Sequence, residues 1–175
     1  MKQLLMVLPL VLLLCFTLSC QQGEEVGVEA EEPVVDIEAE KANVQAVLNQ
    51  YTKAWEALDF ELFSEVFSHD DDMVIFSASP NKRYVGWEVF KEDVQKSFKE
   101  IESIEISFRD IFIKVHASGN IAWLSCFEDW DFVYQGQPVR DEGARVTWIL
   151  EKRNGKWVII HAHWSLPSRE ETTTK

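Results

Sequence analysis

The sequence predicts a cone-shaped α+β domain in which three helices pack on a strongly curved antiparallel sheet. Apolar residues recur with helical spacing up to Ile101, and beyond it the pattern changes to long alternating segments that are typical of strands. Short glycine-bearing turns, "ASGN", "QGQP" and "RNGK", join these segments and indicate successive antiparallel hairpins. Helices first and a meander of strands last is the element order of an α+β domain.

The chain begins with a predicted secretory signal peptide, residues 1–19. Lys2 precedes an apolar run that is too short to favour a stable membrane span. The segment ends in "LSC", which resembles a bacterial lipobox, so we predict export and a lipid anchor on Cys20 in a bacterial membrane. Thr17 stands where that motif usually has Leu. The alternative is an ordinary cleaved signal, which leaves a secreted or periplasmic protein.

Residues 20–36 are predicted to form an acidic disordered tether behind the anchor cysteine, and residues 168–175 a frayed tail. The stretch "QQGEEVGVEAEEPVV" has five Glu, no Lys or Arg and no aromatic residue. Removing residues 1–19 takes one base, Lys2, and no acid from the 17 Lys and Arg and 30 Asp and Glu of the chain, which leaves a net charge of −14. We expect no nucleic-acid partner, because phosphates would be repelled.

Helical spacing marks three segments at the start of the folded domain, which is predicted to span residues 37–167. The first has an apolar stripe made of Val44, Val47, Leu48, Tyr51, Ala54, Trp55 and Leu58. Asp59 is the predicted N-cap of a short second helix in "FELFSEVF", because its carboxylate can accept hydrogen bonds from the free amides of the first turn. A short strand, "MVIFS", precedes the third helix, "WEVFKEDVQKSFKEI".

Four strands are predicted after the helices, over residues 103–116, 121–134, 139–152 and 156–165. Side chains alternate between the two faces of a strand, and we expect the more apolar set of each strand to face the helices. Cys126 falls in such a strand and is predicted to be a small buried apolar residue rather than a disulfide partner. A bent sheet over a long helix would leave a pocket between them.

Three stretches, "YVGWEVF", "GARVTWILEK" and "RNGKWVIIHAHWS", together with the element order from about Ala39 to Pro167, resemble the SnoaL-like branch of the nuclear transport factor 2-like superfamily. This branch is similar to ketosteroid isomerases and to the calmodulin-dependent kinase association domain, and the resemblance implies a cystatin-like fold. The superfamily includes enzymes, binding modules and oligomerisation domains, so the resemblance implies no reaction. A pure interaction domain stays an alternative, because seven tryptophans and eleven phenylalanines fill an interior easily.

The resemblance implies two catalytic positions, and this sequence fits one of them. Tyr51 falls where the isomerases have the tyrosine that stabilises an enolate oxygen. Their carboxylate base falls near Phe76 or Ser77, neither of which can take a proton from a carbon acid. The catalytic candidates are therefore Tyr51, although a tyrosine on an apolar stripe is more often a core residue, and Asp129. We expect a binding protein without a cofactor; the alternative is an isomerase- or cyclase-type enzyme acting on an enolisable substrate.

The run "FEDWDF" brings three acids together on one predicted strand. Asp129 and Asp131 share one side of the strand, and Glu128 takes the other. No nucleophile adjoins them, so we expect a solvated strand end whose acids pair with Arg140 and Arg145 on the neighbouring strand.

An apolar, aromatic pocket for a small apolar or amphipathic molecule is the predicted ligand site. In the association domains that the sequence resembles, the pocket contains arginines, and its positions correspond to Phe127, Trp148 and Trp164, which are all aromatic here. The predicted lining also draws on the first helix and on neighbouring strands, and consists of Tyr51, Trp55, Phe76, Trp123, Phe127, Asp129, Trp148 and Trp164.

Two histidines in "VIIHAHWS", His161 and His163, share one face of the last strand and have a spacing that can grip a metal ion. The sequence indicates no third ligand, so we expect no metal. The predicted outer face of the last two strands consists of Arg145, Thr147, Trp157, Ile159, His161 and His163, which is more apolar than the surface of most monomers. The resemblance implies a dimer contact on this face, and we expect a homodimer.

Overall fold

Three helices precede the long strands in the part of the chain that the computed structural model describes, residues 35–79 and 82–167. The elements are α1 Ile37–Glu56, α2 Phe60–Ser64, β1 Val74–Phe76, β2 Arg83–Val85, α3 Trp87–Glu100, β3 Ile101–Val115, β4 Ile121–Tyr134, β5 Gln137–Arg153 and β6 Lys156–Ser165. The predicted signal peptide, the anchor at Cys20 and the C-terminal tail lie outside the described residues and stay predictions.

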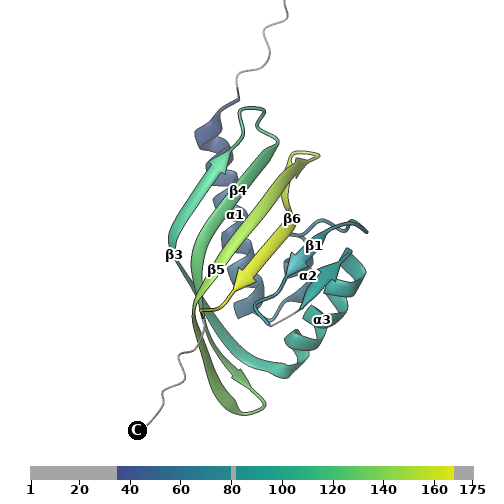
Figure 1. Cartoon of the computed structure of the whole chain (residues 1–175), viewed down its shortest axis with the longest axis vertical. Coiled ribbons are helices and arrows are strands. Elements are labelled where there is room, and N and C mark those ends of the chain that lie inside the picture. Colours follow the sequence, from purple (N-terminus) through teal and green to yellow (C-terminus); the bar gives the residue numbers. More distant parts are fainter. Residues whose placement is uncertain (1–34, 80–81, 168–175) are drawn as a thin grey trace, which may run out of the picture. The chain divides into compact units, whose positions relative to one another are not determined.

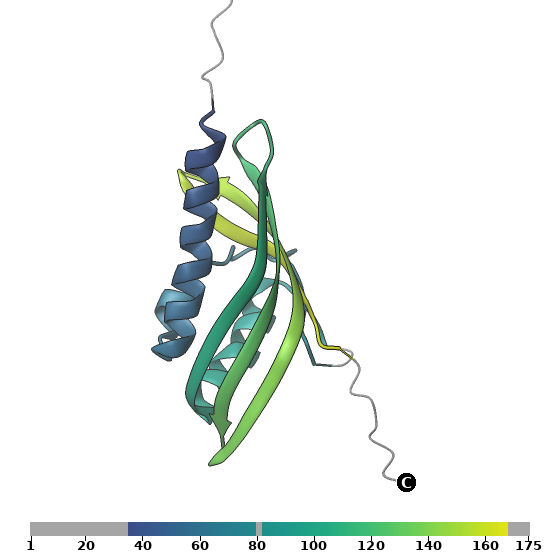
Figure 2. The same ribbon diagram turned by 90° about the vertical axis from the view of Figure 1, so that its left-hand side faces the viewer.

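Helix α1 begins where Asp36 caps it. The side chain of Asp36 accepts a hydrogen bond of 3.0 Å from the amide of Ala39, and two glutamates in the first turn complement the positive end of the helix dipole. Its buried side is the predicted apolar stripe, made of Val44, Val47, Leu48, Tyr51 and Ala54. Figure 2 shows α1 along one side of the long strands, which bend along their length.

Two shorter helices complete the helical layer. Asp59 caps α2 as predicted, because its carboxylate accepts a hydrogen bond of 3.0 Å from the amide of Leu62. Gly86, with φ of 84°, precedes α3; a side chain there would clash with the backbone of Asp71, so the turn into α3 needs glycine. Helix α3 buries Trp87, Phe90 and Val94.

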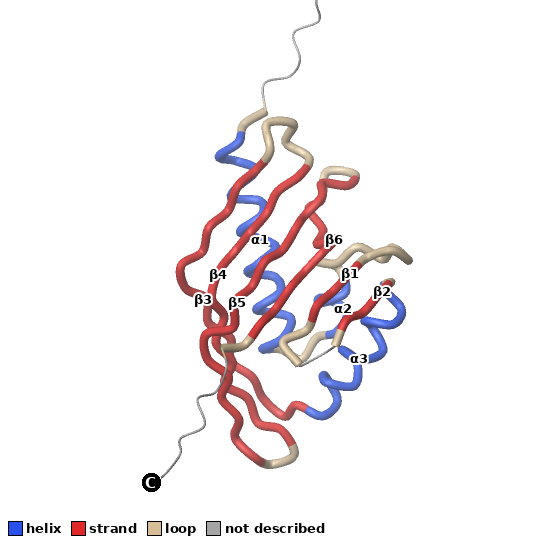
Figure 3. The backbone as a smooth tube through the Cα atoms, viewed as in Figure 1, coloured by secondary structure: helices blue, strands red, loops and turns tan. Residues whose placement is uncertain are grey.

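The six strands form one sheet in the order β2-β1-β6-β5-β4-β3 (Figure 1; Figure 3). Each long strand pairs antiparallel with the next along the chain, as the glycine-bearing turns predict. Strand β1 pairs with β6 in parallel, from Val74 opposite His161 to Phe76 opposite His163. The predicted α+β fold is thus confirmed, and the parallel pair is one difference from the predicted antiparallel sheet.

A β-bulge in β6 changes which residues face the helices. Ile149 pairs with His161 but Leu150 pairs with Ile159, so Ile160 is an extra residue that the partner strand does not match. Trp157 and Ile159 therefore turn inward, where they are buried. The prediction that Trp157 and Ile159 lie on the outer face is wrong, because a shift of one residue moves every following side chain to the other face.

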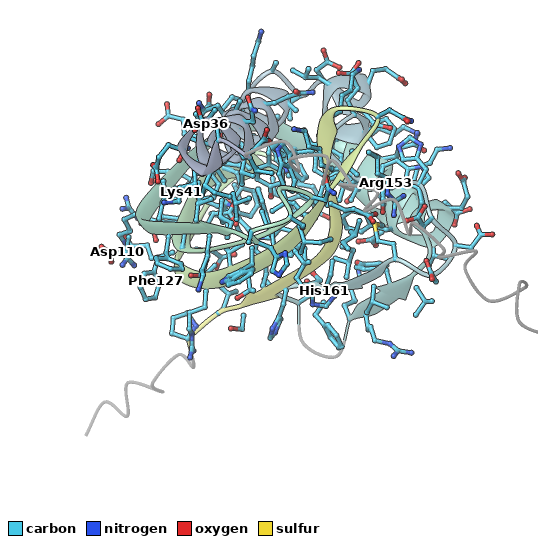
Figure 4. All side chains as sticks on the ribbon, turned by 90° about the horizontal axis from the view of Figure 1, so that it is seen from above. Asp36, Lys41, Asp110, Phe127, Arg153 and His161 are labelled. Carbon is cyan, nitrogen blue, oxygen red and sulfur yellow. The ribbon has the colours of Figure 1, made fainter. Side chains whose placement is uncertain are left out.

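Strand β4 also presents the opposite face to the one predicted. Its buried side chains alternate from Ala122 to Glu128, which leaves Trp123, Phe127 and Asp129 on the face away from the helices. Figure 4 shows Phe127 and His161 on the side of the sheet opposite α1, whose start is marked by Asp36 and Lys41. The prediction placed the bulkier aromatic set inside, but cations cover these rings instead: the Arg109 guanidinium lies 4.4 Å from the Phe127 ring and the Lys114 ammonium 5.3 Å from the Trp123 ring.

Candidate ligand cavity

A cavity of about 400 Å³ lies between α1, α3 and the inner face of the sheet, which is within the size range of small-molecule sites. Its walls are mostly apolar and aromatic, and consist of Tyr51, Trp55, Ser77, Ala78, Ser79, Ser97, Ile101, Ile104, Ile106, Trp130, Phe132, Tyr134, Asp141 and Leu166. A second space of about 180 Å³ shares Tyr51, Trp55 and Trp130 with it, and is also bounded by Trp164, Tyr84 and Asp93.

Local structure brings these side chains together. Tyr51 and Trp55 are one turn apart on α1, so they lie on the same side of the helix, with their ring centroids 6.4 Å apart. In the sheet, a second bulge separates the pairs Glu128–Ala144 and Trp130–Asp141, at Gly143 with φ of 71°. Beyond this bulge, β4 places Trp130, Phe132 and Tyr134 along the cavity.

The predicted pocket residues separate into two groups. Tyr51 and Trp55 line the larger cavity, and Trp164 lines the smaller one. Trp148 is fully buried with its ring centroid 5.0 Å from that of Tyr51, but it lines neither of these two spaces. Trp148 therefore packs behind Tyr51 and holds this wall residue in place.

The remaining predicted pocket residues lie elsewhere. Phe76 is 40% exposed on the outer face, with its ring 5.5 Å from that of His163. Trp123, Phe127 and Asp129 lie on the same outer face. Asp129 accepts a hydrogen bond of 2.6 Å from the amide of Gly143 and lies 3.5 Å from Arg109, so it stabilises the bulge and does not face a ligand.

Glu128 is the acid that faces the interior, so the prediction of a solvated strand end is wrong for this residue. Its side chain is completely buried. Trp164 Nε1 donates a hydrogen bond of 2.6 Å to Oε2 of Glu128, whereas Oε1 has no hydrogen-bond partner among the described residues. The alternation of the strand could have indicated this burial. Glu128 lies on the same face of β4 as Ala122, Leu124 and Cys126, which are apolar and small enough for the core.

Burial in this apolar setting raises the pKa of Glu128 to about 7. Trp130, Trp164 and Tyr51 favour the charged form and oppose the increase, while the neighbouring negative charge of Asp129 adds to it. A carboxyl group with this pKa exchanges its proton near neutral pH, which is the range useful for acid–base chemistry and for a response to a ligand charge.

Tyr51 stands between Glu128 and the cavity. Burial first, and then the charge of Glu128, raise the pKa of Tyr51 well above its ordinary value. The hydroxyl therefore stays protonated at neutral pH, and it interacts with the Glu128 carboxyl group. Trp55 Nε1 is a second donor, buried and without an acceptor among the described residues. Two donors, Tyr51 and Trp55, thus line the wall and one acid, Glu128, lies behind it, all in apolar surroundings where unpaired polar groups are costly.

The outer face of the sheet presents the residues predicted for a dimer contact. Arg145, Thr147 and His163 are exposed and His161 is partly exposed. Phe76 and Ile149, which is 37% exposed, add apolar surface beside them. Across residues 35–79 and 82–167, no three His, Cys, Asp or Glu side chains are grouped as metal ligands.

A helical layer on a curved sheet, with an aromatic cavity between them, defines a class of small α+β domains that enclose a ligand-sized space. The model of the SnoaL-like domain family matches residues 44–169, most of the chain, and the chain belongs to this family. The resemblance predicted from the sequence is therefore confirmed. No curated protein matches the sequence. None of the helices in the described part is both long and apolar enough to cross a membrane.

Solved structures share the fold at low sequence identity. A nuclear transport factor 2-like superfamily protein from Salmonella enterica serovar Typhimurium is 19% identical with a TM-score of 0.67, and the match covers 79% of this chain and 98% of that one. A candidate dehydratase of the same family from Streptomyces avermitilis is 16% identical with a TM-score of 0.68, covering 75% and 99%. An uncharacterized Caulobacter vibrioides protein with a cystatin-like fold is 21% identical with a TM-score of 0.62, covering 74% and 91%. At these identities the likeness shows the fold alone.

Proposed function

We propose that this SnoaL-like domain binds a small apolar or amphipathic molecule in the cavity of about 400 Å³. The observation that supports this most strongly is the wall itself, where aromatic rings from α1 and β4 line a space that opens to solvent and is left unfilled by side chains. Trp55, which lines the cavity, adds a second support, because its buried Nε1 has no hydrogen-bond partner among the described residues and a bound molecule can satisfy such an atom.

Blocking the cavity tests this proposal. Ser97 lines both spaces from α3, so Ser97→Phe places a ring inside the cavity. The matched control is Ser103→Phe on β3, where the side chain is exposed. Native mass spectrometry of protein purified from its own host should find a small molecule bound to the wild type and to the control variant, and none bound to Ser97→Phe. Equal occupancy in the two variants would contradict ligand binding in this cavity.

Catalysis is a second candidate function, favoured by one observation: a fully buried carboxyl group with a pKa near 7 beside a protonated tyrosine. This arrangement suits proton transfer on an enolisable substrate, with Tyr51 donating to the developing oxyanion. Glu128 takes the role for which Asp129 was the candidate. Exchange of the α-protons of β-tetralone in heavy water, followed by NMR, should stop in Glu128→Gln and persist in Asp129→Asn. Exchange that persists in Glu128→Gln would exclude this mechanism.

Dimerisation through the outer face of the sheet is proposed as the assembly of the domain. Support comes from the apolar surface that Phe76 and Ile149 leave exposed beside His161 and His163. Light scattering at micromolar concentration should give twice the mass of one chain. A monomeric mass would remove this proposal.

Membrane anchoring through Cys20 remains the proposed location of the protein in the cell. The "LSC" ending of the signal segment supports it. The wild type should partition into the detergent phase of a Triton X-114 extraction, and Cys20→Ala should move to the aqueous phase. A wild type that stays aqueous would favour the secreted or periplasmic form.

A further inference from the structure

The charges around the cavity restrict the chemistry of its occupant. Among the described residues that line the two spaces, the ionisable side chains other than tyrosine are Asp93 and Asp141, and none is Lys, Arg or His. A carboxylate ligand would therefore meet acids and no base along these walls.

Two cations adjacent to these acids already have acidic partners. Lys82 lies 2.7 Å from Asp93 in an ion pair, and the hydroxyl of Tyr84 donates to the other oxygen of Asp93. Arg140, beside Asp141 in sequence, pairs with Glu142. Neither cation lines the two spaces, so neither supplies a free positive charge for an anionic ligand.

Aromatic rings and a buried acid together favour a positive charge. Tyr51, Trp55 and Trp130 line both spaces, and aromatic rings attract ammonium groups through their electron-rich faces. Glu128 lies directly behind this wall, since it interacts with Tyr51, Trp130 and Trp164, which all line the smaller space. Charges separated by one layer of apolar side chains are weakly screened, so a cation in the cavity would be attracted to this carboxylate.

We infer that the occupant of the cavity is an organic cation, a molecule with an aromatic or aliphatic body and one ammonium group, held against the aromatic wall behind which the Glu128 carboxylate is buried. This inference rests on the proposed ligand-binding function and names the class of ligand. The body of the molecule replaces the water in the apolar part of the cavity. Its ammonium group lies toward Tyr51 and Trp130, on the side where Glu128 is buried.

Three probes of nearly equal size separate charge preference from apolar binding: 2-(1-naphthyl)ethylamine, 2-(1-naphthyl)ethanol and 1-naphthylacetate. Isothermal titration calorimetry should show that the amine binds about tenfold more tightly than the alcohol, and that the alcohol binds more tightly than the carboxylate. If the alcohol or the carboxylate binds best, the inferred ligand class is overturned while the proposed binding function stands. If none of the three binds at millimolar concentration, both are overturned.

Glu128→Gln identifies the group responsible for the preference, with Glu92→Gln on the exposed side of α3 as the matched control. The preference for the amine over the alcohol should fall several-fold in Glu128→Gln, whereas the control should bind both molecules like the wild type. An undiminished preference for the amine in Glu128→Gln would overturn the part assigned to Glu128.

Proton release gives a readout that a change in shape alone would not produce. The titratable groups that face Glu128 are Tyr51 from α1 and Cys126 and Asp129 from β4. Burial and the charge of Glu128 raise the pKa of Cys126 to about 12, the pKa of Tyr51 is also well above neutrality, and Asp129 is paired with Arg109.

Glu128 is therefore the member of this group that titrates near pH 7, and a bound cation should displace its proton. The binding heat of the amine at pH 7 should differ between buffers of different ionisation enthalpy in the wild type and agree between them in Glu128→Gln. Heats that agree between buffers in the wild type would contradict the inference.

Discussion

Replacing Glu128 by glutamine should make the protein more stable above neutral pH. The pKa of Glu128 is about 7 in the folded protein, whereas the ordinary value for glutamate is 4.5. Folding therefore favours the protonated form. The stability that this group contributes is fully present below pH 4.5, and it is lost as the pH rises through 7, because the unfolded chain releases the proton first. Glutamine has nearly the same shape as protonated glutamate but does not ionise, so the variant does not lose this stability as the pH rises.

The size of the effect follows from the pKa difference. A change from 4.5 to about 7 corresponds to about 3 kcal/mol of unfolding free energy, of which about 2 to 3 kcal/mol falls between pH 5 and pH 8.5. Other acids act in the opposite direction. Hydrogen bonds from Lys152 and Arg153 lower the pKa values of Glu40 and Asp70, so both acids stabilise the folded state less as the pH falls. The difference between wild type and variant removes these shared contributions.

Chemical denaturation at pH 5, 6, 7, 8 and 8.5 measures this difference directly. At pH 5 the two proteins should be nearly equal, and at pH 8.5 Glu128→Gln should be more stable by about 2 to 3 kcal/mol. The exposed control Glu92→Gln should stay within about 0.5 kcal/mol of the wild type throughout. A constant difference between wild type and Glu128→Gln across the series would refute the reasoning, because it would mean that Glu128 titrates alike in the folded and unfolded chains.

Three further changes have effects that follow from single contacts. Trp148→Ala should cost about 3 to 5 kcal/mol of unfolding free energy in denaturant titrations, because a fully buried ring is removed from behind Tyr51. Trp157→Phe should cost about 1 kcal/mol by the same assay, since it removes the N–H that donates at 2.8 Å to Glu40. Ile149→Asp places a charge on the outer face, and should give a monomer by light scattering with an unchanged circular dichroism spectrum. A dimer in this variant would show that the dimer contact lies on another surface.

The order of elements could be predicted because each depends on local sequence. The apolar stripe of α1 and the helix caps depend on residues that are three or four apart in sequence. Asp59 could therefore be identified as an N-cap without knowledge of the fold. The hairpins are likewise indicated by short turns such as "RNGK". In that turn Asn154 and Gly155 both have positive φ, as a tight two-residue connection requires.

The faces of the strands could not be predicted in the same way, because a bulge is not visible as an apolar pattern. Ile160 continues the apolar run of β6 without interruption, yet it is the extra residue that turns Trp157 and Ile159 inward. On β4 the prediction assumed that larger aromatic residues face the core. Arg109 and Lys114 from β3 cover the outward aromatic rings instead, a contact between strands that a single strand cannot reveal.

Glu128 is an acid on an otherwise apolar face of β4, and this exception is the reason why we include it in the proposed site. Up to Glu128 the inward residues of β4 are core residues, and immediately after it the register with β5 shifts and the strand reaches the cavity wall at Trp130. An apolar residue at this junction would avoid the loss of about 3 kcal/mol that an acid causes above neutral pH. The acid is partly compensated by Trp164, but its second oxygen has no partner among the described residues. A group that weakens the folded state and leaves one oxygen without a hydrogen bond, behind the wall of a cavity of about 400 Å³, supports the proposed ligand site better than it supports a purely structural role.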